Sequence, residues 1–257
     1  MLIAIAVVAL MVGCAPKIKV PAPQINLPAP QINVNVPQPQ VNVGPQQPQV
    51  APQGPQMQIM VNYAPVVFYY AFSTGGYWIW LENLKPGDWV KFDIKTGEPS
   101  SPNMTIEKAF LKVVEDGKQW WRVTYTADVD TLIYEVLFSP DMSSILRVRA
   151  KATGDTAPSE LPVTENMGYA QPLKLTKESI EGATVGFEQV TVPAGTFTAR
   201  HVKYGVPGGG GTLEWWLVED VPGGVIKYRI TDPEGKLVVE ALLESYGSGA
   251  TTILNSY

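Results

Sequence analysis

Residues 119–127, QWWRVTYTA, decide the fold class of this chain, because apolar and polar side chains alternate along them. Neighbouring side chains of an extended strand point to opposite faces of a sheet. Trp121 therefore shares one face with Val123, and Trp120 shares the other with Arg122. The pattern predicts an antiparallel strand with one buried and one polar side.

The same alternation continues on both sides of this stretch and is interrupted at short intervals by Gly, Pro and Asp. The predicted strands are 66–72, 77–81, 88–95, 105–115, 119–127, 131–138, 144–152, 184–192, 196–206, 213–218, 225–231 and 236–246. Helical patterns are short, at 176–181 and, as an alternative to a strand, at 106–114. The prolines and glycines of residues 154–172 predict a long loop. We expect an all-β domain, mainly antiparallel, built as a single large curved sheet or half-open barrel with few short helices.

Composition excludes several classes of protein. The chain has 257 residues with one cysteine and one histidine, which excludes a disulfide framework, a Cys-based zinc cluster and a multi-His metal site. Its net charge is -5 and it has no basic run, which argues against a nucleic-acid partner. We therefore expect neither a metal nor another cofactor.

The amino end has the pattern of a secretion signal. Residues 2–13 are uniformly apolar but too few to cross a bilayer core, which needs roughly 20 helical residues. The run ends in Met11-Val-Gly-Cys14-Ala15, which resembles the lipobox of bacterial lipoproteins. The resemblance implies a signal peptide over 1–13 and acylation of Cys14. Ala15, in place of an acidic residue, favours the outer membrane, facing the periplasm. The alternative is an incidental cysteine near a frayed terminus.

Residues 14–56 predict a disordered stalk. From 16 to 56 there are 11 prolines and 9 glutamines, with only Lys17 and Lys19 charged. Repeats run PAPQINL (21–27), PAPQINV (28–34) and PQPQVNV (37–43), and their prolines forbid a helical repeat. A stiff tether is the favoured interpretation and a docking ligand is the alternative. The regular Ile/Val-Asn pairs are the one feature that a spacer does not require. The folded domain is predicted to cover 57–257.

Strand parity separates the tryptophans into two groups. Trp121 and Trp215 share faces with apolar residues and are expected in the core. Trp89, Trp120 and Trp216 project from otherwise polar faces. Exposed aromatic area marks a binding surface, so these three indoles are the predicted ligand-binding residues. The alternative is that a loop or short helix covers them as a second small core.

Enzyme chemistry has little support in the sequence. His201 is the sole imidazole and no nucleophile motif accompanies it. Glu214, Glu219 and Asp220 lie near Trp215 and Trp216, as the carboxylates of a glycosidase would, but their separation does not follow from the sequence. We predict that the protein is not an enzyme, and keep a polysaccharide-acting enzyme as a minor alternative.

Three stretches together resemble the envelope domains of the LolA/LolB and DUF3108-like group. They are LKPGDWV (84–90), VTVPAGTF (190–197) and EWWLVEDVPGGVIKY (214–228), and the resemblance covers about residues 84–246. It implies an unclosed, strongly curved antiparallel sheet. In the carrier members of that group the concave face holds acyl chains.

Together these observations predict a lipid-anchored envelope lipoprotein whose β domain binds an apolar or amphiphilic ligand. The alternative is a structural or assembly lipoprotein that binds a partner protein in the envelope.

Overall fold

The computed structural model describes residues 55–72, 77–78, 84–98, 101–163, 167, 173–206 and 210–257. Most of them form one antiparallel sheet of eleven strands in the order β7-β6-β5-β4-β3-β2-β13-β12-β11-β10-β9. The strands are β2 (Trp89–Thr96), β3 (Met104–Val113), β4 (Gln119–Ala127), β5 (Asp130–Phe138), β6 (Ile145–Ala152), β7 (Ser159–Leu161), β9 (Thr184–Val192), β10 (Gly195–Gly205), β11 (Thr212–Leu217), β12 (Val225–Thr231) and β13 (Leu237–Gly247).

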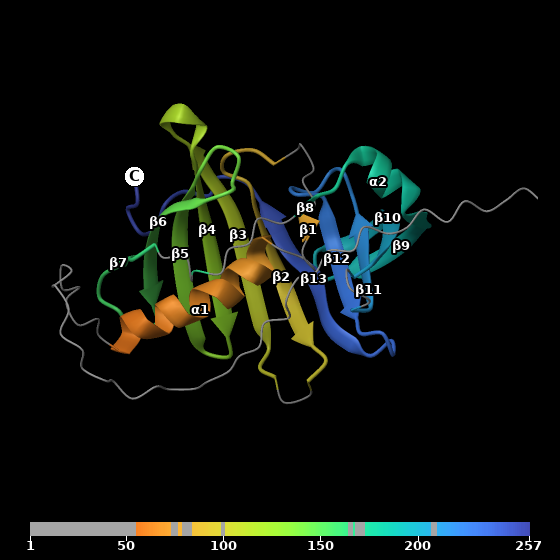
Figure 1. Cartoon of the computed structure of the whole chain (residues 1–257), viewed down its shortest axis with the longest axis horizontal. Coiled ribbons are helices and arrows are strands. Elements are labelled where there is room, and N and C mark those ends of the chain that lie inside the picture. Colours follow the sequence, from red (N-terminus) through yellow and green to blue (C-terminus); the bar gives the residue numbers. More distant parts are fainter. Residues whose placement is uncertain are drawn as a thin grey trace, which may run out of the picture.

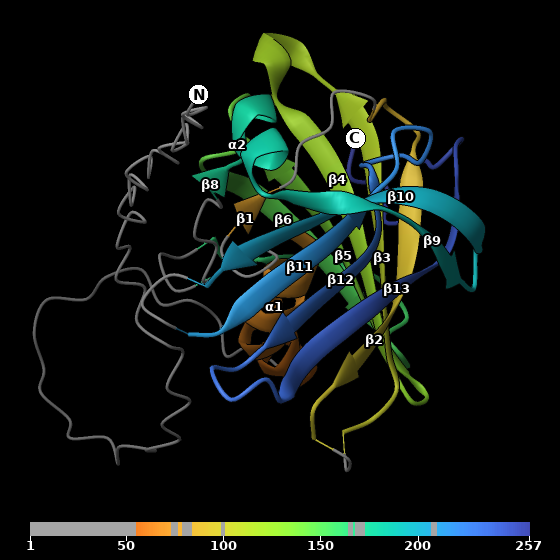
Figure 2. The same cartoon turned by 90° about the vertical axis from the view of Figure 1, so that its right-hand side faces the viewer.

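The sheet is strongly curved and does not close. Figure 2 shows β10 to β13 running across in front of β3 to β6, so the two halves of the sheet face different directions. The strand order ends at β7 on one side and at β9 on the other, which leaves two edges. The prediction of an all-β, unclosed antiparallel sheet is confirmed.

Helix α1 (Pro55–Phe72) is the largest departure from the prediction, which placed a strand at 66–72. It lies across the inner face of β3 to β6 (Figure 1). Buried side chains recur at helical spacing along it, at Met60, Ala64, Val67, Phe68, Ala71 and Phe72. A short apolar run fits a strand or a buried helix equally well, so the residues 66–72 alone could not distinguish them.

The main core lies between α1 and this inner face and continues onto β10 to β13, where Leu213 and Trp215 belong to it. The Phe68 ring packs edge-on against Tyr134, with centroids 5.4 Å apart, and Phe72 packs against Trp121 at 5.7 Å. The Tyr134 hydroxyl donates a hydrogen bond to the Met60 carbonyl at 2.7 Å. The core positions expected for Trp121 and Trp215 are confirmed, since both are essentially inaccessible.

The remaining elements are short. Helix α2 (Lys177–Gly182) matches the predicted helix at 176–181, and the Thr176 side chain caps its first turn by accepting from the Ser179 amide. The stretch 106–114 is strand rather than helix. The predicted loop at 154–172 contains β7, and β1 (Tyr77–Trp78) pairs in parallel with β8 (Leu173–Lys174). No described helix is long and apolar enough to cross a membrane.

Candidate binding surfaces

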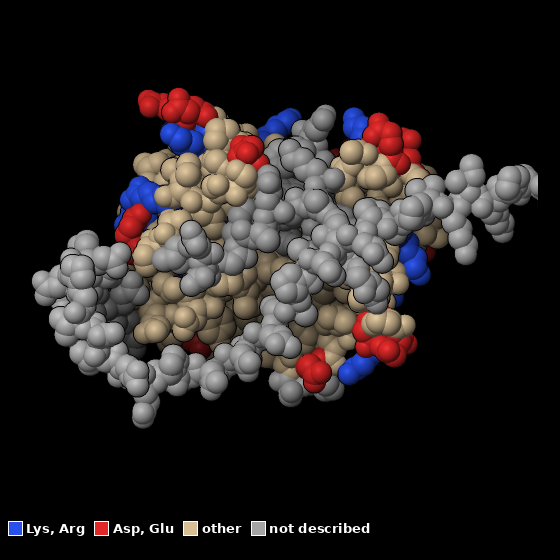
Figure 3. All heavy atoms as spheres, in the orientation of Figure 1, with Lys and Arg blue, Asp and Glu red and all other residues tan. Residues whose placement is uncertain are grey.

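The outward side of α1 carries a stripe of exposed apolar residues. Ile59, Tyr63, Val66 and Tyr69 follow one another at helical spacing, and each is between 40% and 48% exposed. The whole helix has no charged residue. In Figure 3, which has α1 towards the viewer, the charged side chains lie mostly at the margins of the described surface. Apolar area gathered in this way marks a binding surface. We call these four residues the α1 stripe.

A cavity of about 550 Å³ adjoins the start of the α1 stripe. Ile59 and Tyr63 form one side of it, and Tyr125 and Leu132 of β4 and β5 are among its other lining residues. Burial raises the pKa of the Tyr125 hydroxyl, so this group stays neutral. The cavity therefore has an apolar side that continues from the stripe, and it is also lined by Asp128 and Asp130.

Lys108 is a cationic residue beside the main core. Its ammonium nitrogen lies 5.8 Å from the centre of the Phe72 ring, near the end of α1. Burial lowers the pKa of Lys108 to about 8, because the charged form is poorly solvated there. The side chain still carries a proton at neutral pH.

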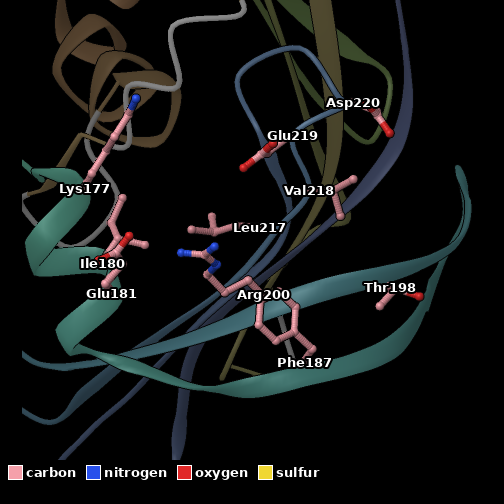
Figure 4. Close-up of a pocket in the computed structure, with 10 residues that line it drawn as sticks. All are labelled: Lys177, Ile180, Glu181, Phe187, Thr198, Arg200, Leu217, Val218, Glu219 and Asp220. Carbon is pink, nitrogen blue, oxygen red and sulfur yellow. The ribbon is translucent and has the colours of Figure 1, made fainter.

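A second cavity, of about 380 Å³, lies between α2, the β9–β10 hairpin and the end of β11 (Figure 4). Ile180, Phe187 and Leu217 give it apolar walls. The Arg200 guanidinium carbon lies 5.3 Å from the centre of the Phe187 ring, and Lys177 of α2 also lines the cavity. Acidic residues also line this cavity, namely Glu181, Glu219 and Asp220. Charges of both signs beside an apolar wall suit a small group with both polar and apolar parts.

Trp120 is not exposed as predicted, although parity places it on the outer face. It is only 3% exposed, and it packs with Ala109 and Leu111. The cover is the C-terminal segment, whose Tyr257 ring lies 5.9 Å from the indole. The sequence interpretation considered a loop or short helix as the cover, not the chain end.

Glu135 explains why the C-terminal segment lies on the outer face. Its buried carboxylate accepts hydrogen bonds from the Thr252 hydroxyl at 2.6 Å and from the Ile253 and Leu254 amides at 2.7 and 3.2 Å. Arg122 adds a bond to the Thr251 carbonyl at 2.7 Å. A buried carboxylate with its acceptor sites occupied is a stable anchor for the backbone.

Trp216 is also buried, at 6% exposed, so the exposure predicted for it is wrong. The His201 ring stacks on its indole with centroids 4.6 Å apart. Lys227 lies opposite Trp216 on the neighbouring strand β12, and its ammonium is 4.7 Å from the centre of the Trp216 ring. The indole N–H donates to Glu188. His201 in turn contacts Glu214 at 3.1 Å. This cluster is a closed network of side chains on β9 to β12.

Trp89 is half-buried and packs beside the Trp120 cluster. The three predicted indoles therefore do not meet at one site: Trp89 and Trp120 adjoin one cluster, and Trp216 belongs to another. A ligand-binding role for them stays a prediction.

Two other predictions concern Cys14 and the carboxylates near Trp216. Cys14 lies outside the described residues. Glu219 and Asp220 line the cavity beside α2, whereas Glu214 forms a hydrogen bond with His201.

The α1 stripe is the candidate surface that the sequence interpretation missed. The signal was present in the apolar residues at 59, 63, 66 and 69, which interleave with the buried set at 60, 64, 67 and 68. Among the described residues no group of His, Cys, Asp and Glu could hold a metal ion.

Comparisons with known proteins give only weak similarities. No protein-family model matches the chain, and no curated protein matches it. One similar solved structure is a protein with a YmcC-like fold from Bacteroides fragilis. The match has 13% sequence identity and a TM-score of 0.36, and it covers 64% of this chain and 97% of that chain. Another is MucB in its complex with MucA from Pseudomonas aeruginosa, at 12% identity and a TM-score of 0.40, covering 77% of this chain and 57% of that chain.

A DUF1329 family protein from Desulfovibrio piger is similar at 10% identity and a TM-score of 0.34, covering 76% of this chain and 94% of that one. Values this low carry no argument about function. The fold assignment rests on the sheet itself, and the resemblance to the LolA/LolB and DUF3108-like group stays a prediction.

Proposed function

We propose that this protein is a lipid-anchored envelope lipoprotein whose β domain binds the apolar part of an amphiphile on the α1 stripe. The observation that carries the proposal is an uncharged helix with four partly exposed apolar residues leading into a cavity of about 550 Å³. Such a volume is within the range of small-molecule sites, roughly 300–1,000 Å³.

The chemistry of the stripe supports this ligand class. Tyr63 and Tyr69 offer an aromatic face together with a hydroxyl, which suits the boundary between an acyl chain and its polar head. Asp128 and Asp130 line the cavity, so its charged lining residues are acidic rather than basic. A neutral or cationic head is therefore favoured over an anionic one at that end.

The test is titration of the full chain with a fluorescent alkyl amine of about twelve carbons. We expect Ile59→Asn with Tyr63→Asn, which remove apolar surface without adding charge, to weaken binding at least tenfold, about 1.4 kcal/mol. The matched control is Val238→Asn, because Val238 of β13 is as exposed as the stripe residues and belongs neither to the stripe nor to the cavity lining. Absence of binding by the unaltered chain, or equal binding by the double variant, would reject the proposal.

The anchor has its own test. Cells expressing the chain and fed radiolabelled palmitate should yield a labelled protein, and Cys14→Ser should abolish the label. Labelling that persists in Cys14→Ser would remove the anchor but would leave the binding site untouched.

A second candidate function, binding of a partner protein, is favoured by the aromatic content of the same stripe. Tyrosine is enriched at protein interfaces, and an apolar helix of a partner would fit beside α1. In-cell crosslinking from Tyr69 to a defined protein, together with failure of the alkyl-amine titration, would favour this function over the first.

A further inference from the structure

Strand β9 is an edge of the sheet that no other described strand covers. It pairs with β10 on one side only. Alternate residues of an edge strand point their N–H and C=O groups away from the paired neighbour, which leaves them available to another strand. Within the described part of the chain, β9 therefore presents a row of backbone groups that no strand pairs with, along nine residues.

β9 lacks some of the usual protections of an edge, although its pairing with β10 has a register shift at Val185. Its sequence, TVGFEQVTV, contains no lysine and no proline, and its only charge is Glu188. Val185 and Phe187 are 62% and 66% exposed, although they are large apolar residues. One face of the Phe187 ring lies under Arg200 of β10 (Figure 4), so the ring is held in place but not covered.

The stalk sequence contains a pattern that complements this edge. Residues 31–36, QINVNV, alternate polar and apolar side chains, and the four-residue forms QINL (24–27) and QVNV (40–43) flank them. Strict alternation of this kind is typical of a half-buried strand, and a spacer does not require it. None of the three segments contains a proline or a charge.

We propose that β9 is the docking site for these stalk repeats, which add to it as an extra short strand. Main-chain hydrogen bonds would supply the affinity, as in other cases of strand addition. The Ile and Val side chains of the repeat would cover Val185 and Phe187, and no charge in the repeat would have to be desolvated. The proposal goes beyond the binding function and does not involve the α1 stripe.

The chain is long enough for the repeat of its own stalk to reach β9. The start of α1 lies at the β7 end of the sheet (Figure 1). Ten strand spacings separate β7 from β9, which amounts to about 48 Å along the sheet. The 18 residues 37–54 lie between the segment 31–36 and the start of α1, and they span about 56 Å in an extended proline-rich conformation.

Docking would have two consequences. It would cover an edge that otherwise invites pairing with a second copy. It would also shorten the free part of the stalk, since only residues 15–30 would remain between Cys14 and the docked repeat.

A photocrosslinking experiment tests the contact directly. The full chain would carry p-benzoylphenylalanine in place of Phe187, and the crosslinked peptide would be identified by mass spectrometry. We expect crosslinks to residues 24–36 in a monomer if the stalk docks on its own domain, and to residues 24–43 in a dimer if it docks on another copy. The same probe at Val129 should give none. Crosslinks to β9 of a second copy, or none to the stalk, would overturn the proposal.

Hydrogen exchange gives an independent readout. Placing Asp at Ile25, Ile32 and Val41 puts one charge in each repeat, and we expect the β9 amides to exchange at least tenfold faster while the β5 amides are unchanged. The control places Asp at Gln46, Gln47 and Gln49, which adds the same charge outside the repeats. Equal β9 exchange in the unaltered chain and both variants would overturn the proposal.

Discussion

The two ends of the sheet are built in opposite ways. β7 has only three residues, its Leu161 is buried, and its Glu160 is held by the Arg147 guanidinium at 2.6 and 2.9 Å. α1 packs against this end. β9 has nine residues and two largely exposed apolar side chains. The comparison shows that one edge is short and covered within the folded part, whereas the other is long and exposes apolar side chains, as docking of a further strand would require.

The same contrast extends into the faces of the sheet. The β3–β6 half is covered by α1 on its inner face and by the C-terminal segment on its outer face. At the β9 end, the short helix α2 buries Ile180 in the core and lies beside a cavity. Replacing a buried residue under α1 should therefore cost more stability than replacing an exposed residue on β9.

The largest expected effect is at Phe68. Phe68→Ala removes a buried ring between α1 and β5, and we expect it to lower the free energy of unfolding by about 3–5 kcal/mol. Phe187→Ala on β9 is the matched control and should cost less than about 0.5 kcal/mol, because its ring is largely exposed. Urea denaturation measures both. Equal losses would contradict the contrast between the two halves.

Glu135 tests the cover on the outer face. Glu135→Ala leaves two backbone amides and the Thr252 hydroxyl without their acceptor, and should cost about 2–3 kcal/mol. Amides 251–257 should then exchange faster and Trp120 should become accessible to a quencher. Glu234→Ala, at an exposed turn, is the control. Unchanged exchange at the C-terminal segment would show that Glu135 does not hold it.

Lys108 tests the inner face of the same half through pH. Its folded pKa of about 8 lies below the model-compound value of 10.5, so the unfolded state binds more protons between these values. The contribution of Lys108 to the free energy of unfolding should therefore become less unfavourable as the pH rises from 8 towards 10.5. Lys108→Met should stabilise the fold by about 2 kcal/mol at pH 7 and by much less at pH 10. A difference that does not change with pH would reject the burial of the charge.

Most of the sheet could be predicted from the sequence, because alternation fixes both the strand and its facing. β4, β9 and β12 begin and end where the pattern placed them. The facing of Trp120 and Trp121 also followed from parity, since they lie in different clusters. These features depend only on local residue order.

The features that failed depend on what packs against a face. Helix α1 contains Pro65 and an apolar run that also suits a strand, and only the inner face of the sheet decides in favour of a helix. The burial of Trp120 requires a segment more than 100 residues away in the chain, positioned by Glu135. Parity gives the direction of a side chain but not what covers it.

The smallest expected effect on stability is at Val185 of β9. Val185→Lys should change the free energy of unfolding by less than about 0.5 kcal/mol, because the side chain is mostly in solvent. Its effect should instead appear in association, since a lysine on an edge strand opposes pairing with another strand. The chain with Asp at positions 25, 32 and 41 has an undocked edge by our proposal and should self-associate as its concentration rises.

Adding Val185→Lys to that chain should return it to a monomer in static light scattering. Val129→Lys gives the same charge change at an exposed turn and should not do so. If the two lysine variants behave alike, association does not proceed through β9, and its exposed apolar residues are ordinary surface residues. If only Val185→Lys restores the monomer, the chain self-associates through the β9 edge, as the length and composition of this strand indicate.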